Sequence, residues 1–145
     1  QPAAYEAPAA AVAGELLEEH FGPVVLLLRH GSREELLAAL ARIDGQLTGS
    51  VHAQPDDDVA DVVAALAERA GRVVFDGFPT GVAVTHGMHH GGPFPATTSP
   101  LHTSVGMTAT GRFTRPIAFQ NAPEHALPPE LRDGNPLGIR RRNSG

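Results

Sequence analysis

Residues 18–29, Glu18-Glu19-His20-Phe21-Gly22-Pro23-Val24-Val25-Leu26-Leu27-Leu28-Arg29, decide the fold of this chain. A Gly-Pro turn leads directly into the apolar run Val24–Leu28. A continuous apolar run of this length is typical of a strand that is covered on both faces, as in a parallel sheet. The stretch therefore predicts a charged and aromatic loop that feeds a buried strand.

Alternating helices and strands are expected after this loop. Ser32 and Glu35 have the spacing of a capping box, and a helical stripe of leucines follows before Gly45 stops the helix. The acidic run Asp56–Asp58 suits the start of a second helix, because a helix N-terminus favours negative charge. The predicted elements are a strand at Val24–Arg29, a helix from Ser32 to Gly45, a strand at Gln46–Ala53, a helix from Asp56 through Ala70 to Gly71, and a strand at Arg72–Phe75.

This order predicts an α/β fold with one parallel sheet and flanking helices, since parallel neighbours need crossover connections. Ligands of such sheets bind beyond the carboxyl ends of the strands. The remaining segments are expected to be a loop at Gln1–Gly14, a long functional loop at Gly77–His102, a helix from Thr103 or Ser104 to Arg115, a strand at Ile117–Gln120 and an extended, proline-containing tail.

Composition narrows the class of protein. The chain has 145 residues and a formal net charge of −5, which argues against a nucleic-acid surface. It has no cysteine, which fits a reducing compartment, and no apolar run long enough to span a membrane. We expect a cytoplasmic protein with no nucleic-acid or membrane partner.

Glu19 and Phe21 are the first candidate site residues. A carboxylate ahead of a Gly-Pro turn can accept hydrogen bonds from the two hydroxyls of a ribose. An aromatic side chain two residues later lies on the same side of an extended chain and can pack against a flat ring. The alternative is structural: Glu18 and Glu19 would be a solvated helix end and Phe21 a core residue before a strand.

The motif resembles the Glu-Glu-x-Phe-Gly-Pro signature of the aldehyde dehydrogenase superfamily. In that family the second Glu binds the nicotinamide ribose and the Phe contacts the nicotinamide, roles that the resemblance implies for Glu19 and Phe21. His20 stands where the family has an aliphatic residue. The segment from Glu68 to Val82 also resembles the family, with Asp76 in the place of the usual Asn.

The segment Thr85–Thr97 departs from the general family pattern. It is similar to one branch, the alpha-ketoglutaric semialdehyde (2,5-dioxovalerate) dehydrogenases, as are Thr103–Arg115, Arg115–Asn121 and Leu127–Asp133. The resemblance implies an enzyme that uses NAD or NADP to oxidise a small-molecule aldehyde to a carboxylic acid, here alpha-ketoglutaric semialdehyde to 2-oxoglutarate.

The family's nucleophile is a cysteine upstream of the Glu-Glu-x-Phe-Gly-Pro motif. We therefore expect a C-terminal fragment, inactive alone, whose partner is the missing N-terminal part of the same enzyme. Residues 1–115 are expected to be the last part of the catalytic domain. Residues 116–145 are expected to be an oligomerisation strand and tail, which implies a homo-oligomer.

The long loop supplies the candidate substrate pocket: Phe78, Thr80, His86, His89, His90 and Phe94. The three histidines could bind a metal, but no cysteine or nearby carboxylate supports that role, and no metal site is expected. They could instead hydrogen-bond to an acidic substrate, or have no role. Ser99 and His102 suggest a hydrolase, yet the chain has no Gly-x-Ser-x-Gly elbow.

Two alternatives to this function stay open. The chain could be a non-catalytic assembly domain, in which a βα unit and an edge strand serve mainly for subunit contacts. It could also come from an aldehyde dehydrogenase of other specificity.

Overall fold

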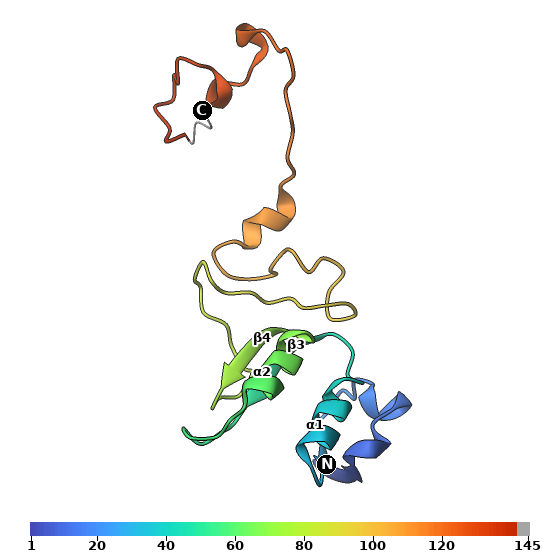
Figure 1. Cartoon of the computed structure of the whole chain (residues 1–145). Coiled ribbons are helices and arrows are strands. Elements are labelled where there is room, and N and C mark those ends of the chain that lie inside the picture. Colours follow the sequence, from blue (N-terminus) through green and yellow to red (C-terminus); the bar gives the residue numbers. More distant parts are fainter. Residues whose placement is uncertain (142–145) are drawn as a thin grey trace. The chain divides into compact units, whose positions relative to one another are not determined.

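The computed structural model describes residues 1–141 and has two units, Gln1–Phe113 and a second one that begins at Thr114 (Figure 1). The predicted α/β class is confirmed. The strands and helices are β1 (Ala3–Pro8), β2 (Val24–Arg29), α1 (Arg33–Leu40), β3 (Gln46–Val51), α2 (Ala60–Ala67) and β4 (Ala70–Phe75). Short 3-10 helices are formed by Ala9–Ala11, Gly14–Leu17, Ala109–Phe113, Glu124–Ala126 and Pro129–Leu131.

Strands β1 and β2 form a two-stranded parallel sheet, with Ala3 opposite Val24 and Pro8 opposite Arg29. The expectation of a loop at Gln1–Gly14 is therefore wrong over β1. Its sequence has no apolar run, and the strand is held by backbone donors and acceptors that the side-chain pattern does not reveal. Pro8 is the last residue of the strand, a position where a missing N–H is tolerated.

The side chains of β2 are less covered than the apolar run predicts. Val24, Val25 and Leu27 expose 43%, 50% and 52% of their surface. Buried residues lie instead between the first 3-10 turn and α1, where Ala9, Val12 and Ala39 are almost inaccessible. Arg42 ties this end of α1 to the turn by donating to the carbonyl of Ala10 at 2.9 Å.

Helix α1 begins as its capping box predicts. The Ser32 hydroxyl accepts from the N–H of Glu35 at 3.3 Å, and the Glu35 carboxylate accepts from the N–H of Gly31 at 2.7 Å. The Ser32 bond satisfies one of the backbone donors that a helix start leaves unpaired, whereas the Glu35 carboxylate binds the N–H of Gly31, the residue before the cap, and not that of Ser32.

Strands β3 and β4 form a second parallel pair, connected by α2, with Gln46 opposite Ala70 and Val51 opposite Phe75. The Asp58 carboxylate accepts from the N–H of Ala60 at the start of α2, as the acidic run predicts. The predicted helix end at Gly71 is wrong. The Arg69 carbonyl accepts from the N–H of Gln46, so the chain has already joined β3 when it reaches Ala70.

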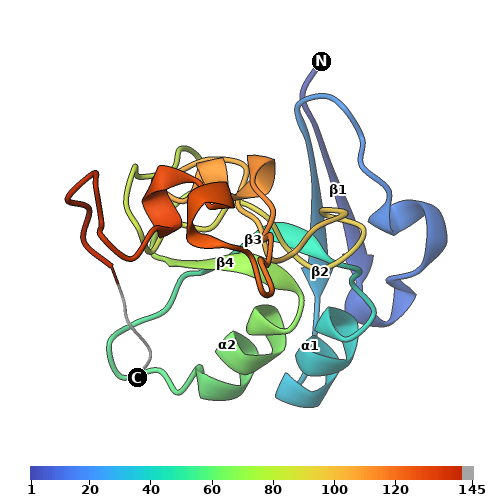
Figure 2. The same ribbon diagram turned by 90° about the horizontal axis from the view of Figure 1, so that it is seen from above.

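The expectation of one parallel sheet is also corrected, because β1 pairs with β2 and β3 pairs with β4 in two separate sheets. Helices α1 and α2 contact each other and lie side by side on one side of the strands (Figure 2). Arg33 on α1 connects the helices: its Nε donates to Asp61 of α2 at 2.7 Å, and its Nη2 donates to the carbonyl of Asp58 at 2.5 Å. The hydrogen bonds of Arg33 thus form a polar clamp between α1 and α2. The sequence predicts that both helices pack on one sheet, whereas the strands form two separate pairs.

The segment Gly91–Phe94 crosses the starts of β3 and β4, and its backbone atoms lie in direct contact with the backbone of those strands. A Cβ atom on Gly45 would overlap the carbonyl of Pro93, one on Gly71 the carbonyl of Gly91, and one on Gly92 the carbonyl of Gln46. Only glycine allows peptide groups to approach this closely. Gly91 and Gly92 are buried as a result.

The long loop at Gly77–His102 is confirmed, whereas the helix predicted from Thr103 to Arg115 is wrong. Only Ala109–Phe113 forms a 3-10 turn there. Gly106 has φ +96, outside the helical region, which interrupts the segment.

The second unit, as far as the structure describes it, consists of irregular chain and two 3-10 turns. Glu124 accepts from the N–H of Asp133 at 2.8 Å, and Arg132 donates to the carbonyl of Leu127 at 2.9 Å. Ile117–Gln120 is irregular here, so an oligomerisation strand stays a prediction, and the last four residues of the predicted tail lie outside the described part. Among residues 1–141, no helix has the length and apolar character needed to cross a membrane.

The clamp between α1 and α2 makes stability depend on pH. The hydrogen bond from Arg33 lowers the pKa of Asp61 below its ordinary value of 3.8. A lowered carboxyl pKa adds stability above the ordinary value, and this stability is lost as the pH falls through the lowered one. We expect Asp61→Asn to reduce the free energy of unfolding at pH 7, by an amount that shrinks in acid. Asp56→Asn is the matched control, and a pH-independent effect of Asp61→Asn would contradict the clamp.

The close backbone approach makes Gly71 intolerant of a side chain. Because the added methyl group meets a carbonyl rather than a flexible side chain, we expect Gly71→Ala to lower the free energy of unfolding by about 1–3 kcal/mol or more. Gly87→Ala is the control, since nothing lies within 4 Å of its Cβ position. Equal urea midpoints for the two variants would show that the crossing is not tight.

Candidate functional site

Glu19 lies on an acidic hollow at the start of β3. The hollow has a volume of about 750 Å³, and its walls include Leu17, Glu18, Glu19, Asp44, Thr48 and Pro95. Glu19 is exposed, and the 3-10 turn Gly14–Leu17 ends just before it. The carboxylate is therefore open to a ligand that donates hydrogen bonds, such as a vicinal diol.

Phe21 exposes 95% of its surface in the loop before β2. The alternative prediction, that Phe21 is a core residue before a strand, is therefore wrong for this chain. An aromatic ring this exposed is free to contact a flat ligand or another part of a larger protein.

Phe78 and Thr80 lie in the loop after β4, and Arg72 of β4 fixes that loop. Its Nη1 donates to the carbonyl of Gly81 at 2.6 Å, its Nη2 to that of Pro79 at 3.1 Å, and its Nε to the hydroxyl of Thr48 at 3.2 Å. The Phe78 ring lies 6.2 Å from the His52 ring, with the planes tilted by 59°. Sequence reasoning missed Arg72, because no motif predicts its partners, two backbone carbonyls and the Thr48 hydroxyl.

The end of β4 has a strained turn. Asp76 has φ +48, and its carboxylate accepts from the N–H of Ala53 at 3.2 Å. Asn and Asp tolerate this left-handed conformation better than other non-glycine residues. This geometry explains how Asp can stand where the resembled family usually has Asn.

The three loop histidines do not converge. His86 is exposed on a turn, and the His89 ring lies beside Gly91, where a Cβ atom would be 2.8 Å from its Nε2. His90 lines a second hollow, whereas Phe94 points 77% of its surface to solvent. Within the described residues, no group of three or more His, Asp and Glu side chains has the arrangement of a metal site.

The second hollow, which contains His90, has a volume of about 470 Å³. Its walls also include Thr97, Ser99, His102, Ser104 and Arg112, and it shares Leu47 and Ala96 with the acidic hollow. The Ser99 hydroxyl and His102 Nδ1 are 2.8 Å apart, within hydrogen-bond distance. Sequence reasoning paired Ser99 with His102 but missed Arg112, because its neighbours are distant in the sequence.

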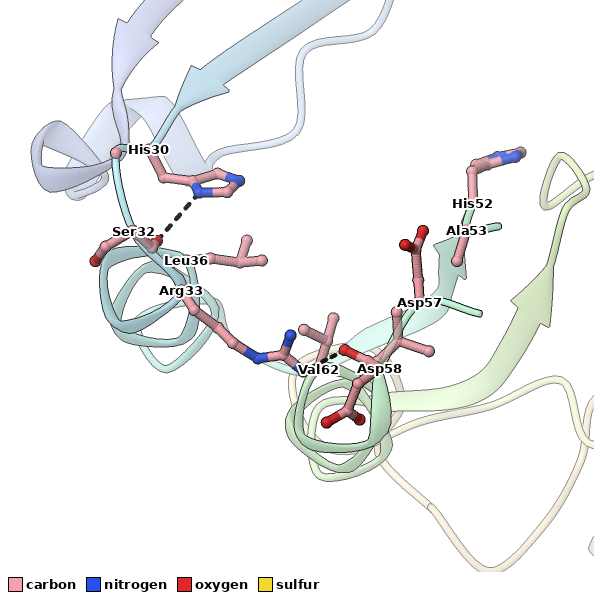
Figure 3. A pocket seen from close by; sticks show the side chains of 11 residues that line it. His30, Ser32, Arg33, Leu36, His52, Ala53, Asp57, Asp58 and Val62 are labelled. Carbon is pink, nitrogen blue, oxygen red and sulfur yellow. Dashed lines mark hydrogen bonds between the residues drawn. The ribbon is translucent and has the colours of Figure 1, made fainter. Parts of the chain in front are cut away.

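A third hollow, of about 490 Å³, lies where β2 and β3 end and α1 and α2 begin (Figure 3). His30, Arg33, His52, Asp57 and Asp58 contribute to its walls. Most of its polar groups are already paired within the chain. His30 Nδ1 lies 3.1 Å from the Ser32 carbonyl, and Asp57 accepts from the N–H of Gln54 at 2.8 Å. None of the sequence-predicted site residues lines this hollow.

Comparison with known proteins identifies the family. An alpha-ketoglutaric semialdehyde dehydrogenase 2 of Azospirillum brasilense is 42% identical over 147 positions, which cover 99% of this chain. An alpha-ketoglutaric semialdehyde dehydrogenase of Acinetobacter baylyi is 44% identical over 133 positions, 90% of the chain. The chain belongs to the aldehyde dehydrogenase superfamily.

The family predicted from Glu-Glu-His-Phe-Gly-Pro is thereby confirmed. The aligned span is 28% of the Azospirillum protein and 25% of the Acinetobacter protein, so the chain spans about a quarter of the length of these curated relatives. No protein-family model matches the sequence. The assignment to the aldehyde dehydrogenases rests on sequence identity of 42–44% to these relatives over nearly the whole chain.

Proposed function

We propose that this chain is the C-terminal part of an NAD(P)-dependent aldehyde dehydrogenase that converts alpha-ketoglutaric semialdehyde to 2-oxoglutarate. The observation that carries the proposal is identity of 42–44% over nearly the whole chain to two proteins that bear this name. The short aligned share supports a longer parent protein. The half-exposed apolar side chains of β2 support it as well, because additional chain would cover them.

Glu19 and Phe21 suit a nicotinamide cofactor. The exposed Glu19 carboxylate faces a hollow large enough for a ribose, and the exposed Phe21 ring can contact a flat heterocycle. When bound, the nicotinamide accepts a hydride from the substrate. Glu19 would accept hydrogen bonds from the ribose hydroxyls and so fix the distance between donor and acceptor. The choice between NAD and NADP is made elsewhere in the parent enzyme.

The thiolate that attacks the aldehyde is expected in the parent outside this chain, which contains no cysteine. We propose that the segment from Phe78 to Phe94, with Thr80, His86, His89 and His90, borders the aldehyde site. Arg72 and the glycine crossing hold its two ends. We also propose that residues 116–145 contribute to a homo-oligomer and that the enzyme is cytoplasmic.

Glu19→Gln in the intact enzyme tests the cofactor role. The amide keeps the shape of the side chain but loses charge-assisted hydrogen bonds, so we expect single-turnover hydride transfer to slow by about tenfold to a hundredfold. Glu18→Gln changes the same charge in the same hollow and is expected to be nearly neutral. Wild-type kinetics for Glu19→Gln, or equal losses in both variants, would remove the ribose contact.

Substrate choice tests the function itself. We expect NAD- or NADP-dependent oxidation of alpha-ketoglutaric semialdehyde with a kcat/KM above that of an uncharged aldehyde of equal length, because the loop offers imidazole and hydroxyl donors to a carboxylate. Formation of the reduced cofactor is followed by absorbance. Equal kcat/KM values would point to an aldehyde dehydrogenase of other specificity. No turnover with any aldehyde would favour the assembly-domain alternative.

A further inference from the structure

The hollow between His90 and Arg112 has the composition of an anion site. None of its lining side chains is a carboxylate, while Arg112, His90 and His102 supply nitrogen donors and Thr97, Ser99 and Ser104 supply hydroxyls. A cavity lined by donors and cationic groups favours a negatively charged ligand.

Arg112 is available to such a ligand. In the described part of the chain its guanidinium forms no ion pair, whereas Arg29 and Arg33 are each paired with a carboxylate. Its Cζ lies 5.6 Å from the centre of the Phe113 ring, a cation–π contact that leaves the N–H donors unused. Arg112 is also exposed to solvent, so a ligand can reach it.

The backbone at His90 is held from both sides. Its N–H donates to the buried Thr103 hydroxyl at 2.8 Å, and its carbonyl accepts from the N–H and the hydroxyl of Ser104, each at 3.0 Å. The backbone position is therefore fixed before any ligand binds. His90 Nδ1 is nevertheless buried without a hydrogen-bond partner among the described residues. A buried polar atom that has no partner in the protein can hydrogen-bond to a ligand in the cavity beside it.

His102 brings the third nitrogen donor close to Arg112. A Cβ atom on Gly111 would lie 3.9 Å from His102 Cδ2, so the 3-10 turn that carries Arg112 rests against this imidazole. The hydrogen bond between Ser99 and His102 Nδ1 sets the orientation of the ring, and Nε2 forms no hydrogen bond to another residue in the described part of the chain. Three donor groups from separate segments thus surround one cavity.

We propose that this hollow binds the carboxylate group of a small organic acid, with Arg112 as the charge partner and His90 and His102 as additional donors. The anion site itself is independent of the proposed function. Only the choice of the organic acid rests on that function. The hollow adjoins that of Glu19 through Leu47 and Ala96, which suggests the distal carboxylate of the acidic substrate or product. Phosphate shares the oxoanion chemistry and is distinguished below.

Calorimetric titration of the intact enzyme with glutarate tests the site without any turnover. We expect one glutarate per chain, no binding of the neutral glutaramide, and weaker binding of inorganic phosphate. Arg112→Gln should raise the glutarate Kd about tenfold or more, and Arg112→Lys should raise it less, because Lys keeps the charge but not the fork of donors. Arg115→Gln, the same change outside the hollow, should leave the Kd unchanged.

His102→Asn keeps the proposal testable if Arg112→Gln fails to fold, and its expected result is also a raised Kd. Wild-type glutarate affinity in folded Arg112→Gln and His102→Asn would overturn the site, and phosphate binding as tight as glutarate binding would overturn its carboxylate preference.

A selective loss of kcat/KM for the semialdehyde in Arg112→Gln would assign the site to the substrate. Unchanged kcat/KM with a raised glutarate Kd would assign it to a separate acid. An enzyme without aldehyde oxidation but with Arg112-dependent glutarate binding would refute the proposed function alone.

Discussion

Two stretches of backbone come into direct contact where Gly91–Phe94 crosses the starts of β3 and β4. The crossing needs glycine at Gly45, Gly71 and Gly92, because a Cβ atom at any of them would overlap a carbonyl group. His90 directly precedes the crossing segment, and the turn Ala109–Phe113, which carries Arg112, follows it within the same unit. The N-terminal side of the same crossing carries Asp44 and the acidic hollow of Glu19. The two hollows share a wall formed by Leu47 and Ala96, which follow the two stretches of backbone that meet at the crossing.

The charges on the two sides of that wall are separated. Glu18, Glu19 and Asp44 line one hollow, and Arg112 with two histidines lines the other. Such an arrangement suits a reaction in which a ribose donates hydrogen bonds on one side and an organic anion accepts them on the other. Both surfaces remain open in this chain. An aldehyde dehydrogenase that extends beyond the chain would cover them, as it would cover Phe21 and the faces of β2.

Local patterns were enough to predict β2, the capping of α1, β3 and the acidic start of α2, because each depends on residues adjacent in sequence. The pairing of β1 with β2 could not be predicted from Ala3–Pro8, since backbone hydrogen bonds hold that strand. The split into two sheets and the Arg33–Asp61 clamp depend on contacts between segments far apart in sequence. Glu19 was found through a motif, whereas Arg112 and Arg72 belong to no motif and become visible only when the loop is placed beside the strands.

The central claim is that Glu19 holds a nicotinamide ribose in an enzyme of which this chain is one part. A crystal structure of the intact enzyme with its oxidised cofactor bound tests it most directly. The account predicts a Glu19 carboxylate oxygen about 2.5–3.0 Å from a hydroxyl of the nicotinamide ribose, with Phe21 against the nicotinamide side. A well-ordered cofactor whose ribose hydroxyls bind other residues, with Glu19 left in solvent, would contradict it.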